Sequence, residues 1–276
     1  MSPQKSVIKR FLSCLKERRI PVAFNAPLGK FLIKRDLFMT SIFGKPKMPE
    51  NSRILYASSV GKHGKPFLEK IIKSADLPNV DFLIFVYDET PFDEPTFHSC
   101  RFIYEKGTKW PYLKKYLTPS FCKSYDYLFF WDDDIEIKNF SFRQFIEIMR
   151  RNALEMAQPA LTRDSFHSTV LTLQVEGKIG RFTDFVEIMV PVFTQVAWSK
   201  FWEMMAFENN LWGWGYDLIA KSFCRYQRMG IIDNQTVKHT RPVQSHNFGA
   251  REEMKQYLDA HQHYRKSARI SSGYLK

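Results

Sequence analysis

Two uninterrupted runs of apolar and aromatic residues, Phe82–Tyr87 and Tyr127–Trp131, constrain the fold of this chain more than any other feature. A strand that is covered on both faces reads as such a run, and sheets built from these strands are parallel, with helices packed on either side. A third apolar strand is expected over Ile54–Ala57, ending in Ser58-Ser59-Val60-Gly61.

Helical patterns alternate with these strands up to about residue 150, which predicts a doubly wound parallel sheet. In this half we expect strands at 54–57, 82–87, 101–104 and 127–131, and helices at 65–75, 109–117 and 141–152. In the second half we expect strands at 168–175, 185–193 and 231–238, and helices at 195–207, 216–228 and 250–264. The whole pattern predicts an α/β fold with a Rossmann-type mixed sheet and helices on both faces.

The 276 residues suit one large domain with extensions, because 44% hydrophobic and 16% aromatic residues exclude a disordered chain. We expect a basic N-terminal extension over residues 1–52, with a short helix in 1–20 and an irregular lead-in from 21. The main folded domain is expected over 53–249. A basic C-terminal helix and tail follow over 250–276.

The net charge of +12 is unevenly distributed. Residues 1–50 carry +8 and residues 251–276 carry +3, which leaves +1 for the middle of the chain. A nucleic-acid enzyme would more often spread basic charge along its working groove, so no nucleic-acid partner is expected. Basic ends suit peripheral contact with an anionic membrane face or an anionic acceptor, or they only keep the chain soluble. The sequence defines no oligomeric state.

Cysteine usage and hydropathy suggest a cytoplasmic protein. The four cysteines form no C-x-x-C pair and are too few for a disulfide framework, so reduced thiols are expected. No apolar run approaches the roughly 18 residues of a membrane span, and the N-terminal residues have no secretory pattern.

The acidic triplet Asp132-Asp133-Asp134 directly follows a buried strand. Three adjacent carboxylates repel one another, and a hard divalent cation would relieve that repulsion with oxygen ligands. In a D-x-D arrangement the first and third side chains point the same way, toward a metal and the ribose or diphosphate of a nucleotide. The alternative is a polar loop that caps a helix.

The segment Trp212-Gly213-Trp214-Gly215-Tyr216-Asp217 is the second distinctive motif. Glycine lets the backbone turn while flat indole faces are presented to a sugar or to a hydrophobic gap. Asp217 would open a helix, where a carboxylate stays ionised, and would serve as a general base. The alternative is a tight helix-entry turn with a capping aspartate.

Three further residues are candidates because of their context. His239 ends an expected strand and, together with the triplet, would be a third metal ligand, a set that suits Mn²⁺ better than Ca²⁺. Glu187 is a carboxylate within an expected apolar strand, either a supporting partner or a ligand for an acceptor hydroxyl. Lys109 opens a helix and either meets a diphosphate or is solvated.

Over residues 53–247 the chain resembles the family known in plants as lysine-ketoglutarate-reductase trans-splicing related proteins, a name that says little about chemistry. The resemblance rests on segments in a fixed order: Val60-Gly61, Tyr87-Asp88, Lys109-Trp110, Tyr125-Asp126-Tyr127, Trp131–Asp134, Asn139-Phe140, Gln158–Leu161, Glu187–Met189, Pro191–Phe193, Trp198, Trp214-Gly215, Asp217 and His239.

The order of D-x-D, W-G-W-G-x-D and histidine also resembles β-1,4-galactosyltransferases of the GT-A fold. This similarity implies an inverting glycosyltransferase that depends on a metal and a nucleotide sugar. By position it implies that Asp134 and His239 bind the metal, that Trp212 and Trp214 flank the sugars, and that Asp217 is the base. The sequence departs from the family at Tyr216, where that family has two further small or acidic residues.

We therefore expect transfer of a sugar from a nucleotide-sugar donor, most simply UDP-linked, to a glycan hydroxyl, giving a β linkage. UDP-galactose and UDP-xylose are first guesses taken from the resemblance. Mn²⁺ or Mg²⁺ is expected at Asp132 or Asp134 with His239. The remaining expected contacts are Ser59, Val60, Gly61, Lys65, Asp88, Lys109, Asp132 and Asp133 for the nucleotide, Trp212, Trp214 and Tyr216 for the acceptor, and Asp217 with Glu187 for catalysis.

Two other functions fit parts of the pattern. A metal-dependent phosphoryl hydrolase would use the triplet in a two-metal site, but it needs a further group of carboxylates. A non-catalytic carbohydrate- or membrane-binding module would keep the segment Trp212–Asp217, called here the tryptophan turn. It would have no use for the triplet or His239.

Overall fold

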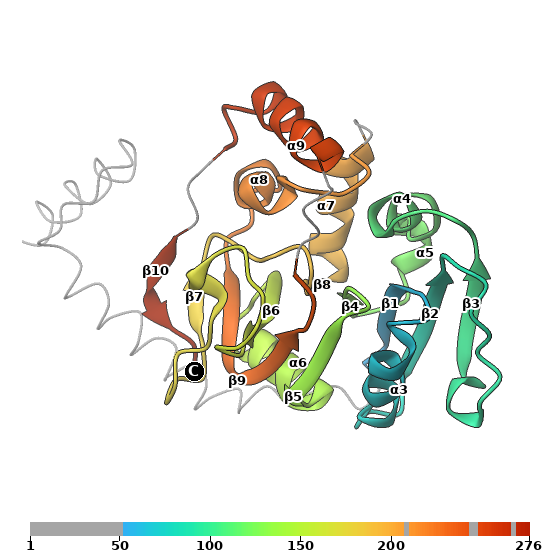
Figure 1. Cartoon of the computed structure of the whole chain (residues 1–276). Coiled ribbons are helices and arrows are strands. Elements are labelled where there is room, and N and C mark those ends of the chain that lie inside the picture. The colour runs from blue at the N-terminus through green and yellow to red at the C-terminus, as the bar shows by residue number, and fades with distance from the viewer. Residues whose placement is uncertain (1–51, 207–209, 243–247, 266–268) are drawn as a thin grey trace, which may run out of the picture. The chain divides into compact units, whose positions relative to one another are not determined.

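The centre of the protein, seen in a computed structural model, is a mixed β-sheet with helices against it (Figure 1). The structure describes residues 52–206, 210–242, 248–265 and 269–276. These belong to one unit, residues 48–276, and the other unit, residues 1–47, lies outside the described residues. The helix expected within 1–20 and the lead-in before residue 52 therefore lie outside them too.

The first half of the chain forms the parallel half of the sheet. Its strands lie in the order β3-β2-β1-β4, and β1 pairs in parallel with both β2 and β4. The strands are β1 Ile54–Val60, β2 Val80–Val86, β3 Cys100–Tyr104 and β4 Tyr127–Phe130. The connecting helices are α3 Lys65–Lys73, η2 Pro95–Phe97, α4 Lys109–Tyr116, α5 Pro119–Cys122 and α6 Phe142–Arg151.

The second half extends this sheet with mixed pairing. β8 lies antiparallel between β4 and β6, while β9 runs parallel to β6 and antiparallel to β5 and β7. The strands are β5 Ile135–Asn139, β6 Met156–Leu161, β7 Arg181–Thr183, β8 Val192–Thr194, β9 Met229–His239 and β10 Ile270–Tyr274. The helices are η3 Val170–Thr172, α7 Gln195–Ala206, α8 Tyr216–Phe223 and α9 Phe248–Ala260.

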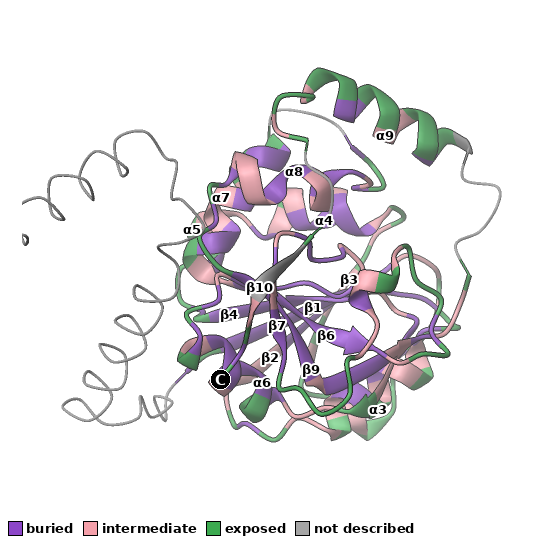
Figure 2. Cartoon of the chain, turned by 90° about the vertical axis from the view of Figure 1, so that its left-hand side faces the viewer, coloured by how far each residue is buried: buried purple, intermediate pink, exposed green. Residues whose placement is uncertain are grey.

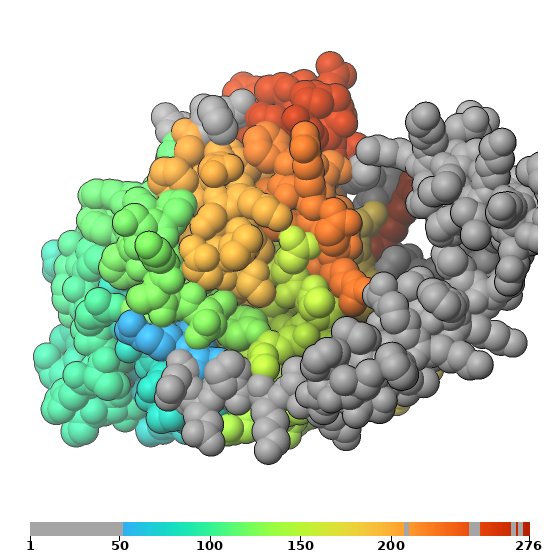
Figure 3. Space-filling model, turned by 180° about the vertical axis from the view of Figure 1, so that it is seen from behind, coloured from blue at the N-terminus to red at the C-terminus, as the bar shows by residue number. Residues whose placement is uncertain are grey.

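Two hydrophobic layers hold the helices against the sheet, one on each face. Successive residues of a strand point to opposite faces, so Ile54 and Tyr56 join the layer under α3 and α6, whereas Leu55 and Ala57 join the layer under α4, α7 and α8. Figure 2 shows the strands largely buried between these layers, and Figure 3 shows α7 and α8 in orange beside α4 and α5 in green. The predicted α/β class, with a mixed sheet and helices on both faces, is confirmed.

Of the strands predicted in the second half, 168–175 is wrong and 185–193 is confirmed only at its last two residues, where β8 begins. Residues 168–175 contain a single 3₁₀ turn, because the side chain of Thr169 accepts a hydrogen bond from Leu171 N and competes with strand pairing. Residues 185–191 are irregular, and only the following β8 is a strand. In that irregular segment Glu187 N donates to the side chain of Gln158, so its backbone bonds to a side chain instead of a neighbouring strand.

The strands β5, β6, β7 and β10 were not predicted. β6 contains Pro159, which argues against a central strand, and the pairing of β6 with β9 shifts register between Pro159 and Ala160. β10 pairs with β7, so the segment expected to be a separate C-terminal tail contributes a strand to the main sheet. None of the helices in the described ranges is both long and apolar enough to cross a membrane.

Candidate active site

A cleft of about 1000 Å³ opens where the parallel strands end, and it gathers most of the predicted site residues. Ligands of open α/β sheets bind at this edge, outside the carboxyl ends of the strands. The predicted residues that line the cleft are Ser59, Lys109, Asp132, Asp133, Asp134, Glu187, Trp212, Trp214, Asp217 and His239. They come from opposite halves of the sequence, so the fold alone brings them together.

Asp132 forms an ion pair with Lys109 at the start of α4. The Lys109 ammonium is buried and also donates to the backbone oxygen of Ile188 at 2.6 Å. Burial raises the pKa of Asp132 to about 6, although the charge of Lys109 opposes the shift. Lys109 is therefore not the solvated lysine that the sequence left open, because it holds the first carboxylate of the triplet in place.

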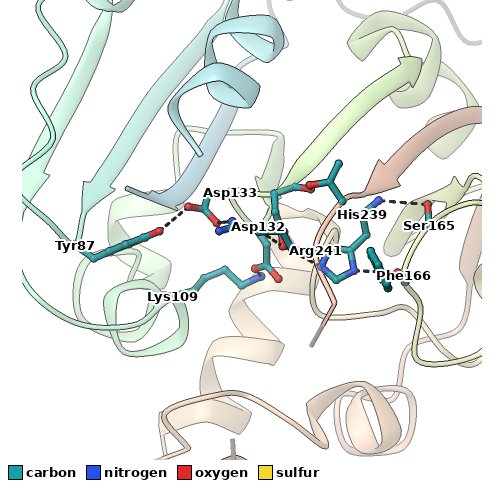
Figure 4. Close-up of polar contacts among 10 residues, drawn as sticks. Tyr87, Lys109, Asp132, Asp133, Ser165, Phe166, His239 and Arg241 are labelled. Carbon is teal, nitrogen blue, oxygen red and sulfur yellow. Dashed lines mark hydrogen bonds and ion pairs between the residues drawn. The ribbon is translucent and has the colours of Figure 1, made fainter. Parts of the chain in front are cut away.

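Asp133 is held by groups from three other segments (Figure 4). The Tyr87 hydroxyl donates to its carboxylate at 2.8 Å, Gly61 N donates at 3.4 Å, and Arg241 forms an ion pair with it. Gly64 lies so close that a Cβ on it would be 2.4 Å from the Cβ of Asp133. The loop after β1 therefore packs directly on the second carboxylate.

Asp134 lies beside His239, and the partners of the two imidazole nitrogens indicate which of them carries a proton. His239 Nδ1 lies 2.9 Å from the carbonyl oxygen of Phe166, which makes it the donor. His239 Nε2 lies 3.1 Å from Asp134 Oδ2, so this pair needs either a second proton or a cation. Burial alone would lower the pKa of His239 and raise that of Asp134, but their mutual attraction reverses both shifts.

Two of the three expected metal ligands fit a divalent cation. Asp134 Oδ1 is buried and has no hydrogen-bond partner in the part of the chain that the structure describes. His239 presents Nε2 while a backbone carbonyl accepts from Nδ1, as in many metal sites. Asp132 instead turns to Lys109. Across the described ranges no three His, Cys, Asp or Glu side chains gather as a metal-binding group, and this ion pair explains why Asp132 does not complete one.

Asp217 and Glu187 form a second acidic pair in the cleft. Burial and the nearby charge of Glu187 raise the pKa of Asp217 to about 7, so it is not the fully ionised capping residue expected from the sequence. Glu187 is 2% exposed, and its Oε1 accepts a hydrogen bond from Ser168 N at 3.1 Å. Its Oε2 is buried and has no hydrogen-bond partner among the described residues.

The tryptophan turn is positioned by α9 and by the residue before α4. Glu253 accepts hydrogen bonds from Leu211 N at 2.7 Å and Trp212 N at 3.2 Å, and Thr108 donates to Leu211 O at 2.7 Å. Gly213 has a φ of +71°, and a Cβ there would be 2.3 Å from the Trp110 indole. The result is a Trp212 ring that is 38% exposed at the cleft.

Five predicted residues do not line the cleft. Val60 is buried in β1, and Tyr216 is buried against Trp110. Lys65 pairs with Glu94 at 2.7 Å, and Asp88 accepts hydrogen bonds from the loop nitrogens of Lys62 and Thr90. Gly61 contributes its N–H to Asp133, as described above.

Sequence reasoning missed several residues that build the cleft. Arg241, Tyr87 and Ser168 hold the carboxylates, and Glu253 holds the tryptophan turn. Arg241 follows His239 by two residues, so its basic charge next to a candidate ligand was the one available signal. No local pattern marks Glu253, which is 41 residues from its partner Trp212.

A model of the family described as "Protein of unknown function (DUF707)" matches residues 25–184 and 174–272. The match does not carry the plant family name expected from the sequence. A comparison with curated proteins finds no match.

Among solved structures, the chain is similar to TarS of S. aureus. The crystal structure of TarS 1-349 in complex with UDP-GlcNAc has a TM-score of 0.48 and 8% identity, over 75% of this chain and 66% of that one. A crystal structure of TarS has a TM-score of 0.49 and 8% identity, over 78% of this chain and 40% of that one. The chain covers less than two thirds of either structure, and likenesses this weak carry no argument about function.

Proposed function

Because the chain belongs to the DUF707 family, whose description names no activity, we propose a function from the cleft itself: a GT-A-like, metal-dependent, inverting glycosyltransferase. It would move a sugar from a nucleotide-sugar donor, UDP-linked, to a carbohydrate hydroxyl. The observation that carries this proposal is the composition of the cleft. The triplet and His239 line it together with Asp217, Glu187 and the exposed Trp212.

The acidic triplet and His239 would bind the diphosphate end of the donor. Asp134 and His239 would hold Mn²⁺ or Mg²⁺, which when bound neutralises the negative charge of the departing diphosphate. Lys109 keeps Asp132 in place beside them, and Ser59 lies at the end of β1 in the same cleft.

Trp212 and Glu187 would bind the acceptor, and Asp217 would supply the base. The exposed face of Trp212 suits the apolar face of a sugar, and the free Oε2 of Glu187 suits a hydroxyl. Asp217 would take the proton of the attacking hydroxyl while its oxygen forms the bond to the anomeric carbon and the bond to the diphosphate breaks. A pKa of about 7 suits this role, because a base works best near the operating pH. A single displacement inverts the anomeric centre and gives a β-linked product from an α-linked donor.

The internal pairing of the triplet speaks against a two-metal phosphoryl hydrolase. That chemistry needs several carboxylates free to bridge two ions, whereas Asp132 and Asp133 are paired with Lys109 and Arg241. A binding module without activity would have no need of a near-neutral carboxylate beside the sugar platform.

Incubation with a panel of UDP- and GDP-sugars, with and without Mn²⁺, tests the proposal. We expect slow release of UDP from one donor, dependent on the ion and accelerated by a glycan acceptor. Phosphate release from phosphomonoesters would support the hydrolase, and glycan binding without donor turnover would support the module. Either result would overturn the transferase.

A further inference from the structure

Arg241 pairs with two of the three carboxylates of the acidic triplet. Its guanidinium reaches two carboxylates at once, pairing with Asp133 through Nη2 and with Asp134 through Nε at 3.2 Å. The preceding Thr240 fixes the backbone, because both its N and its Oγ1 donate to the carbonyl oxygen of Asp134, at 3.1 and 2.9 Å. Arg241 is thus anchored at its backbone, while its side chain remains 38% exposed.

The charges of the described cluster nearly cancel. Asp132 is paired with Lys109, and Asp133 and Asp134 share Arg241, which leaves one negative charge beside His239. The electrostatic attraction of this cluster for a free divalent ion is therefore weak, although it contains three consecutive aspartates.

The same carboxylate oxygen serves two cations. Asp134 Oδ2 accepts from both His239 Nε2 and Arg241 Nε, so a metal ion held by Asp134 and His239 would compete with the guanidinium for that oxygen. The planar guanidinium pairs especially well with phosphate, where two parallel N–H bonds can form. A nucleoside diphosphate in the cleft would offer such a partner.

We propose that Arg241 competes with the divalent ion for Asp134 and is released to the diphosphate, so that the ion and the nucleotide bind together. This inference rests on the proposed function, because it takes the ion and the diphosphate from it. It adds a residue, and a coupling between the two ligands, that the transferase assignment does not require. Arg241 acts here as a binding residue that couples two ligands.

Titration of Mn²⁺ with and without UDP, followed by electron paramagnetic resonance of the free ion, measures the coupling directly. We expect the unaltered protein to bind Mn²⁺ weakly alone and roughly tenfold or more tightly with UDP. In Arg241→Gln we expect Mn²⁺ alone to bind roughly tenfold more tightly, because a competing positive charge is removed, and the gain from UDP to shrink. Arg151→Gln is the matched control, since it removes an arginine that pairs with Glu147 within α6, outside the cleft lining.

Arg241→Lys separates charge from geometry and also serves if the glutamine variant does not fold. Lysine keeps the charge but cannot span both carboxylates, so we expect Mn²⁺ alone to bind more tightly than in the unaltered protein and the gain from UDP to be smaller. Unchanged or weaker binding of Mn²⁺ alone in the variants would overturn the role of Arg241, even if the unaltered protein binds Mn²⁺ with UDP. A protein that binds neither ligand would instead overturn the proposed function.

Discussion

Asp217 shows how the same residue type acquires different properties within one cleft. Burial near Glu187 raises the pKa of Asp217 to about 7, whereas His239 and Arg241 pull the pKa of Asp134 below its ordinary value. Environments that separate the pKa values of two carboxylates also separate their roles. Asp134 is suited to stay charged toward a cation, and Asp217 is suited to accept a proton.

The pKa of Asp217 predicts the pH dependence of transfer. A general base works only when deprotonated, so the turnover number should rise as pH increases through about 7 and level off above it. Initial rates between pH 5.5 and pH 9 with saturating donor measure this rise, which is the acidic limb of the pH profile.

Two variants identify the group behind that limb. Asp217→Asn should lower turnover roughly 10²- to 10⁴-fold, abolish the limb and spare binding of the nucleotide. If Glu187→Gln lost turnover while Asp217→Asn kept it, Glu187 would be the base and Asp217 its partner.

Among the elements, the tryptophan turn depends most on close packing with its neighbours. Asn210 accepts from Gly213 N at 2.6 Å and donates to Trp214 O at 3.0 Å, which closes the turn, and Gly215 then caps α8 with a φ of +95°. The glycines were recognised in the sequence as necessary for a turn. The contact of Gly213 with Trp110 was not recognised, because Trp110 lies about 100 residues earlier in the chain.

Gly213→Ala tests whether this packing positions the sugar platform. Gly177 provides the control, because its φ of +72° nearly equals the +71° of Gly213, but a Cβ there would meet nothing within 4 Å. Both variants should lose about 1–2 kcal/mol of unfolding free energy from the left-handed backbone. Gly213→Ala should lose a further 1–3 kcal/mol or so from the clash with Trp110, and should also weaken acceptor binding. Equal losses in chemical denaturation would mean that the turn can move away from Trp110.

At the scale of the whole molecule, the sheet extends to the last described residues. Leu275 is 5% exposed and belongs to the core layer that contains α3 and α6, while the adjacent Tyr274 is 59% exposed. The C-terminal segment therefore supports the domain that holds the cleft.

Leu275→Ala should lower the free energy of unfolding by about 2–5 kcal/mol, as expected for a buried leucine. Tyr274→Ala should cost less than about 1 kcal/mol, because its contact with Lys178 lies at the surface. Urea denaturation of both variants measures the difference. A Leu275→Ala protein as stable as the Tyr274→Ala protein would show that the strand contributes little to the core.

The sequence predicted the parallel half of the fold well because its strands are fully apolar and its helices have clear ends. Prediction failed where tertiary contacts decide the local structure. The segment around Glu187 bonds to Gln158 and Lys109, and β6 tolerates Pro159 through a shift of register. In the site, residue types with obvious chemistry were found, such as Asp134 and Asp217. Arg241, which pairs with Asp134, and Glu253, which accepts from Trp212 N, were not, since their roles arise only from the folded arrangement.

The most direct measurement is calorimetric titration of UDP with Mn²⁺ into the protein and four variants. Asp134 and His239 are 105 residues apart in sequence but have side chains 3.1 Å apart, so the account requires both in one binding site. Asp134→Ala and His239→Ala should each weaken binding roughly 10- to 100-fold. The exposed Asp93→Ala and His98→Ala should leave it unchanged. Affinity equal to that of the unaltered protein in both Asp134→Ala and His239→Ala, or no binding of UDP with Mn²⁺ to the unaltered protein, would contradict the account.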